Sequence, residues 1–127
     1  MAESSAAAVK AYFLGQAAAV TIWWGLPWAW PPFRGLFATG DAPGEVLASF
    51  ALADAVCLVA GSIVAGLLAD RGHRAASSAA WAVFGATGYS TLLCATMAAR
   101  GDLRWLSVAL MGALTVACAF AASKSGR

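Results

Sequence analysis

The sequence is poor in charge. Asp, Glu, Lys and Arg make up 11% of its 127 residues, against roughly 25% in an ordinary soluble protein. Hydrophobic residues reach 61%. Too little polar surface is left to cover a soluble domain, and too little charge to keep a chain disordered. The net charge of +2 gives no basic footprint for nucleic acid. We therefore expect an integral membrane protein without a nucleic-acid partner.

Residue types that carry chemistry are also scarce. His73 is the single histidine, and Lys10 and Lys124 are the two lysines. One chain therefore cannot hold a haem between two intramembrane histidines, nor form a Schiff base in mid-membrane. The three cysteines are widely spaced and form neither a zinc motif nor a disulfide framework. No arrangement suggests an activated nucleophile or a phosphate loop. We expect no enzymatic activity, no metal and no cofactor.

The sequence contains four long runs with little or no charge. Residues 11–33, 75–99 and 105–123 contain no charge, and residues 46–69 contain only Asp54. A helix that spans a membrane needs about 20 apolar residues. The runs predict an all-α polytopic membrane protein, a four-transmembrane-helix bundle that forms a single domain over residues 1–127. The expected spans are residues 9–30, 46–69, 76–98 and 104–122.

Basic residues set the expected orientation. With four spans, both termini and the middle loop lie on one side of the membrane. That side carries Lys10, Arg71, Arg74, Lys124 and Arg127, whereas the other carries Arg34, Arg100 and Arg104. Because basic loops stay inside, we expect both termini in the cytoplasm. The expected membrane is a plasma membrane or a bacterial-type inner membrane.

Aromatic residues gather at the end of the first span and in the loop that follows it. Amphipathic rings fit the headgroup level of a bilayer, so the cluster is typical of an interfacial belt in contact with membrane lipids. The alternative is a lid or a lipid-binding shelf. The residues expected at this interface are Trp23, Trp28, Trp30, Phe33 and Phe37.

Asp54 is the one charge in the interior of an expected span, away from the span ends. A carboxylate in mid-membrane costs about 2.5–3.5 kcal/mol on insertion scales, so it should face the bundle interior, be paired, or be protonated. At ~1.5 Å per residue it lies ~9 Å from the outer start of its helix, close to the level of Trp24, Tyr89 and Thr91. We expect these four residues to form an intramembrane polar cluster. Its role is either functional or that of a structural link between helices. Asp54 has no second ionisable partner inside the membrane, which slightly favours the structural role.

Small residues mark the expected helix–helix contacts. Alanine supplies 33 of the 127 residues, and small side chains let helices approach closely. Gly61 and Ala65 form such a pair in the second span, and Gly85 and Gly88 lie in the third. We expect these two spans to pack tightly, within the chain or against a partner. The third span should lie in the bundle centre or against another subunit.

The loop between the second and third spans carries a recognisable run. It reads Gly66-Leu-Leu-Ala-Asp70-Arg71-Gly72-His73-Arg74 and resembles the helix 2–3 loop of major facilitator transporters. The first part matches that motif, whereas Gly72 comes one residue early and His73 stands where the motif has Gly. In that family the Asp and Arg latch helix ends in a conformational gate. The resemblance implies that Asp70, Arg71 and Arg74 are gate candidates; the alternative is a tight basic turn that fixes topology.

A second resemblance runs through the first two spans. Its residues are Trp23, Trp24, Pro32, Arg34, Phe37, Phe50, Asp54, Gly61 and Ser62. They resemble the leading helices of some bacterial proteins related to isoprenylcysteine methyltransferases. Nothing in the chain matches a methyltransferase cofactor site, so the resemblance implies no activity.

Three functional hypotheses follow from the sequence. The first is a non-enzymatic accessory or scaffold subunit of a membrane complex, because small-residue faces are abundant and catalytic groups are few. The second is a small transporter or permease-like unit, with Asp54 as a proton- or cation-responsive site. The third is a subunit of a lipid-modifying membrane enzyme. In each case we expect a homo-oligomer or a membrane-protein partner.

Overall fold

The described chain is all-helical. The computed structural model describes residues 2–39 and 44–125, and within these ranges it contains no strand. The elements are α1 (Ala2–Ala29), α2 (Pro31–Arg34), α3 (Gly44–Asp54), the π-helix η1 (Ala55–Ala60), α4 (Gly61–Asp70), α5 (Ala76–Ala99) and α6 (Trp105–Lys124). Because α3, η1 and α4 follow one another without a break, they form one long helix.

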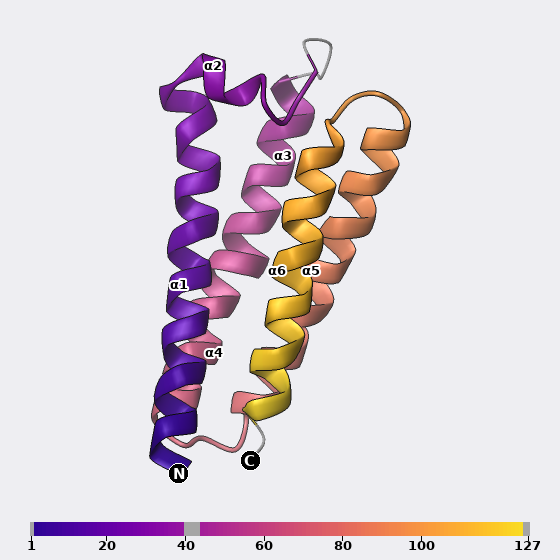
Figure 1. The fold of residues 1–127 in the computed structure, drawn as a ribbon. Helices are drawn as coiled ribbons and strands as arrows, with labels where there is room; N and C mark the ends of the chain where they lie inside the picture. The colour runs from indigo at the N-terminus through magenta and orange to yellow at the C-terminus, as the bar shows by residue number, and fades with distance from the viewer. Residues whose placement is uncertain (1, 40–43, 126–127) are drawn as a thin grey trace.

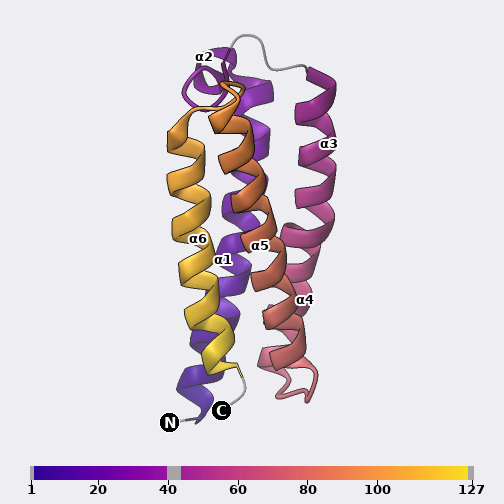
Figure 2. The same cartoon turned by 90° about the vertical axis from the view of Figure 1, so that its right-hand side faces the viewer.

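The long helices run alongside one another (Figure 1). Both termini and the α4–α5 turn lie at one end, which we call the terminal end. The short helix α2 and the α5–α6 turn lie at the other end, which we call the α2 end. Seen from the side, α3 stands apart from α1, α5 and α6 toward the α2 end, whereas α4 lies close to α5 (Figure 2).

Three helices are long and apolar enough to cross a membrane. They are Leu47–Asp70, Ala76–Ala99 and Trp105–Lys124, and they coincide within one or two residues with the second, third and fourth expected spans. The first expected span corresponds to α1, which has 28 residues but is not among the three. Lys10, Gln16 and the tryptophans near its end lower its hydropathy. A helical membrane protein is thus supported, whereas α1 is not confirmed as a span and neither is the count of four.

The main apolar core lies in the terminal half of the bundle. It joins side chains from α1, α4, α5 and α6, among them Val9, Phe13, Ala65, Ala80, Val83 and Cys118. Phe13 and Cys118 are completely buried. The four helices therefore pack tightly at this end, where small side chains on α4 and α5 face larger ones on α1.

Gly66 permits the close approach of α4 to α1. A Cβ atom at this position would lie 3.4 Å from the Cβ of Phe13 and 3.5 Å from the carbonyl oxygen of Lys10. Gly61 permits a similarly close approach of α4 to α5, since a Cβ atom there would lie 3.2 Å from Cγ2 of Val83. Larger side chains at either position would push the helices apart.

The glycines on α5 do not pack against the second span within the chain, and their contact with a partner stays a prediction. A Cβ atom on Gly85 would meet nothing within 4 Å, and one on Gly88 would meet only Thr115 of α6, at 3.9 Å. The second span contributes Gly61 and the buried Ala65 as expected, but the residue of α5 that faces Gly61 is Val83 rather than a glycine. The most extensive contact of α5 is with α6.

The expected central position of the third span is wrong within the single chain. On α5, Trp81 is 46% exposed, Tyr89 68% and Leu92 70%. A helix at the centre of a bundle would bury these large side chains, because its whole circumference would face other helices. Contact of α5 with another subunit, the alternative, stays a prediction.

Replacing Gly66 by valine tests the packing of α1 on α4. We expect Gly66→Val to destabilise the fold by about 1–3 kcal/mol, the usual cost of overpacking. The matched control is Gly85→Val, which makes the same change on a helix surface with open space. Thermal unfolding in dodecyl maltoside should show a clear loss for the first variant only. Equal losses would contradict the proposed packing.

Candidate functional site

Asp54 lies where the long second helix changes its winding. It is the last residue of α3 and directly precedes η1. Counting from Leu47, where the span begins, ~1.5 Å per residue places Asp54 about 10 Å into the apolar segment. π-helical turns are rare and frequently occur at functional sites. No local pattern predicts η1, because its residues are ordinary apolar ones that are compatible with an α-helix.

Two uncharged donors from two other helices hold the Asp54 carboxylate. The indole Nε1–H of Trp24 on α1 donates to Oδ2 at 2.9 Å, and the hydroxyl of Ser90 on α5 donates to Oδ1 at 3.3 Å. The side chain of Asp54 is half-buried. The two hydrogen bonds join α1, α3 and α5 at one level of the bundle. Since a carboxylate offers about four lone-pair sites, they leave it able to accept further donors.

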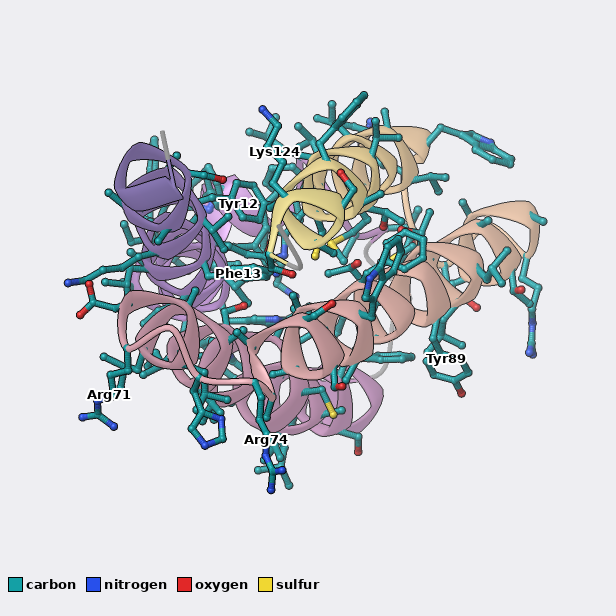
Figure 3. The ribbon with its side chains drawn as sticks, turned by 90° about the horizontal axis from the view of Figure 1, so that it is seen from below. Tyr12, Phe13, Arg71, Arg74, Tyr89 and Lys124 are labelled. Carbon is teal, nitrogen blue, oxygen red and sulfur yellow. The ribbon has the colours of Figure 1, made fainter. Side chains whose placement is uncertain are left out.

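Of the three partners expected for Asp54, the structure brings only Trp24 to it. Tyr89 is 68% exposed and points away from the bundle (Figure 3). The Thr91 hydroxyl donates to the carbonyl oxygen of Thr87 at 2.9 Å and lies 2.9 Å from Oγ1 of Thr115 on α6. Successive residues of a helix point about 100° apart. A count of depth alone therefore cannot distinguish Ser90 from its two neighbours.

A cavity lies beside Asp54. It encloses about 80 Å³, several times the roughly 10–15 Å³ that one water molecule occupies by such a measure. Its aromatic wall consists of Trp23, Trp24, Trp28, Phe37 and Phe50. Asp54, Ser90 and Arg34 are among its polar lining residues. The cavity is thus mostly apolar with a few polar groups, a lining typical of small-molecule sites, in a volume below the roughly 300–1,000 Å³ that is usual for them.

The residues expected in an interfacial aromatic belt divide between the cavity and the surface. The ring centroids of Trp23 and Phe37 lie 4.2 Å apart, and those of Phe33 and Phe37 lie 5.0 Å apart. Trp30 stacks on Phe33 at 6.3 Å. Trp28 and Trp30 are 60% and 58% exposed. Three of these rings therefore form a connected cluster next to the cavity, and Trp30 extends it to the surface.

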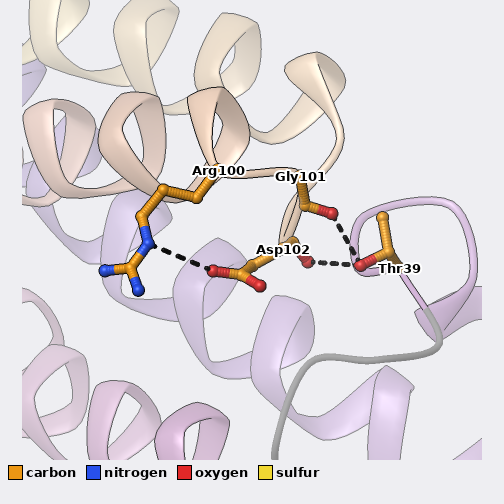
Figure 4. A network of polar contacts seen from close by, with 4 residues as sticks. All are labelled: Thr39, Arg100, Gly101 and Asp102. Atoms are coloured by element: carbon orange, nitrogen blue, oxygen red, sulfur yellow. Dashed lines mark hydrogen bonds and ion pairs between the residues drawn. The ribbon is translucent and has the colours of Figure 1, made fainter.

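The segment after α2 is anchored to the α5–α6 turn. The Thr39 hydroxyl donates to the carbonyl oxygen of Gly101 at 2.8 Å and lies 3.1 Å from that of Asp102 (Figure 4). The backbone N–H of Arg104 donates to the carbonyl oxygen of Phe37 at 2.8 Å. Gly101 has φ +86°, a conformation that favours glycine. These contacts fix the segment that carries Phe37 over the α2 end of the cavity.

A second polar group lies on the terminal side of Asp54. Nε2 of Gln16 donates to the Ser62 hydroxyl at 3.1 Å, and Gln16, Ser62 and Thr87 are all buried. Oε1 of Gln16 is buried without a hydrogen-bond partner among the described residues. Phe13 and Leu58 are completely buried nearby in the same half. Gln16 is not among the residues predicted from the sequence, although an amide within an uncharged run is a detectable signal.

The gate candidates lie at the terminal end. Asp70 forms an ion pair with Lys10 of α1, with 3.0 Å between Oδ1 and Nζ. Arg71 and Arg74 are exposed and extend away from the bundle (Figure 3). Gly72 has φ +58°, which allows the tight turn between them. The structure thus joins Asp70 to α1 rather than to either arginine, and the gating role stays a prediction.

Comparison with known families offers no guide to the site. No protein family, curated protein or solved structure matches the chain. Within residues 2–39 and 44–125, no group of three or more His, Cys, Asp or Glu is arranged to hold a metal ion. Inferences about function therefore rest on the cavity and on the hydrogen bonds of Asp54.

Removing the indole donor tests the Asp54 link. We expect Trp24→Phe to lower the free energy of unfolding by about 0.5–2 kcal/mol, the range for a hydrogen bond between membrane helices. Trp28→Phe is the matched control, because Trp28 is largely exposed. Thermal unfolding of both variants in dodecyl maltoside measures the difference. An equal loss in the two proteins would mean that the Trp24 hydrogen bond contributes nothing.

Proposed function

We propose that the chain is a four-span integral membrane protein in which α1 is the fourth span. The length of α1 supports this, as does its course along the whole bundle (Figure 1). Phe13 and Gln16 are buried against the other helices. The ion pair between Lys10 and Asp70 also supports the proposal, because it joins α1 to the end of the Leu47–Asp70 span. From the distribution of Lys and Arg, the proposal puts the terminal end in the cytoplasm.

Labelling from one side of the membrane tests this topology. Single cysteines are introduced as Ser5→Cys, Ser125→Cys or Arg100→Cys, in a background where Cys57, Cys94 and Cys118 are serine. In intact cells, we expect an impermeant maleimide to label only the Arg100→Cys protein. Labelling at Ser125→Cys and at Ser5→Cys should both require disrupted membranes. If these two positions reacted from opposite sides, α1 would not be a span.

We further propose that the protein is a non-enzymatic accessory subunit that binds an amphipathic ligand in the cavity beside Asp54. The cavity itself is the observation that carries this proposal, since it combines aromatic walls with one carboxylate. The terminal side is filled by Phe13, Leu58 and the Gln16–Ser62 pair. That filling supports a bound ligand rather than an open path through the bundle. A homo-oligomer or another membrane protein remains the proposed partner.

A transporter is the second candidate. The observation that favours it is η1, which follows Asp54 directly and lies where α3 begins to separate from the other helices (Figure 2). An irregular turn in mid-helix often marks a functional hinge. A transport cycle would have to open the packed terminal half, and so few helices enclose little space. A transporter would therefore require more than one copy of the chain.

Native mass spectrometry of protein released gently from its host membrane tests the proposed function. We expect a bound small molecule on the wild type, retained by Leu92→Trp on the exposed face of α5 and lost from Cys94→Trp, which fills the cavity. A complex with another protein would support the accessory subunit. A homo-oligomer alone would favour the transporter. A ligand retained by Cys94→Trp would contradict binding in the cavity.

A further inference from the structure

The carboxylate of Asp54 faces the cavity with only uncharged partners. Its hydrogen bonds come from an indole N–H and a hydroxyl, contributed by Trp24 and Ser90. The ion pairs formed within the described parts of the chain are Lys10–Asp70 and Arg100–Asp102, which do not involve it. A buried or half-buried charge is normally matched by an opposite one. The Asp54 carboxylate can therefore still take a positively charged partner.

The walls beside this carboxylate are aromatic. Trp23 and Trp24 come from the last third of α1, Phe37 from the segment after α2, and Phe50 from α3 one turn before Asp54. The negative face of an aromatic ring attracts a cation within about 6 Å, and tryptophan does so best. Arg34 also lines the cavity, but within the described residues no ion pair joins it to Asp54. The region around Asp54 is thus the part of the cavity suited to a cation.

Other ligand classes fit this region less well. An anion would be repelled by the carboxylate. A bare metal ion requires several oxygen ligands, about six to eight for calcium, whereas among the described residues the side-chain oxygens joined at Asp54 are its own and that of Ser90. A strongly hydrated ammonium would have to exchange its water for aromatic walls. A quaternary ammonium has an apolar surface and needs no hydrogen-bond acceptor, so it loses little on entering.

Resting on the cavity-binding function proposed above, we propose that the ligand is a hydrophobic cation of the quaternary ammonium class. Its charged group lies among the rings of Trp23, Trp24 and Phe37, against the carboxylate of Asp54. Its apolar part extends along the aromatic wall toward the α2 end. The positive charge of the ligand supplies the counter-charge that the described partners of Asp54 do not provide.

Two probes of equal shape test this directly. One is 4-fluorobenzyltrimethylammonium, and the other is its neutral carbon isostere, 1-fluoro-4-(2,2-dimethylpropyl)benzene. Binding to the full-length protein in dodecyl maltoside, an uncharged detergent, is followed by fluorine NMR as a saturable change that Cys94→Trp abolishes. We expect the cation to bind the wild type at least about tenfold more tightly than the isostere, because the Asp54 carboxylate attracts a positive charge and so do the faces of the aromatic rings. Equal affinities would overturn the proposal without the need for any charge variant.

Matched charge variants locate the effect. We expect Asp54→Asn to weaken binding of the cation about tenfold or more, because the Coulombic attraction of the carboxylate is lost, with little change for the isostere. Asp102→Asn removes the same charge from the α5–α6 turn, outside the cavity, and should leave both affinities unchanged. Unchanged binding of the cation to Asp54→Asn would also overturn the proposal. If the isostere bound in a manner that Cys94→Trp abolished, cavity binding would stand and only the cation class would fail. If neither probe bound in that manner, both proposals would fail.

Discussion

Two hydrogen bonds to the carboxylate of Asp54 hold the bundle together at the level where α3 separates from its neighbours. The carboxylate is costly in an apolar surrounding unless it is bonded, and Trp24 and Ser90 supply donors from α1 and α5. Beyond this level, α3 has extensive contact only with η1, its own continuation, among the described helices. Below it, η1 and α4 pack against α1 and α5. The link therefore marks the boundary between a closely packed half of the bundle and an open one.

The cavity is a consequence of that boundary. Where α3 diverges, aromatic side chains from α1, α3 and the segment after α2 line the space that the helix leaves. The contacts of Thr39 with the α5–α6 turn hold that segment in place. On the terminal side, Phe13 and Leu58 are completely buried, and a separate pocket opens beyond them at the tip of the bundle, beside Asp70 and Arg71. An aromatic site with one carboxylate at its inner end is thus a product of tight packing on one side and divergence on the other.

Uncharged runs predict the second, third and fourth spans within one or two residues, because the hydrophobicity of a whole helix determines whether it can span a membrane. They did not establish α1 as a span, since Gln16 and the tryptophans dilute its hydropathy. Depth counting placed Trp24 level with Asp54 but could not select Ser90 over Tyr89, because it contains no information on helix rotation. The π-helix, the open space around Gly85 and the Thr39–Gly101 contact depend on packing between distant segments. No local pattern in the sequence encodes them.

The most direct test of this account is the behaviour of the Trp24 indole N–H. In a ¹H–¹⁵N correlation spectrum of the detergent-solubilised protein, each of the six tryptophans gives one indole signal. We expect the Trp24 signal, assigned by its loss in Trp24→Phe, to exchange with deuterium more slowly than those of the exposed Trp28 and Trp30, and to shift most strongly in Asp54→Asn. If the Trp24 signal exchanged as fast as these two and did not respond to Asp54→Asn, the central link of the structure would not exist in the protein.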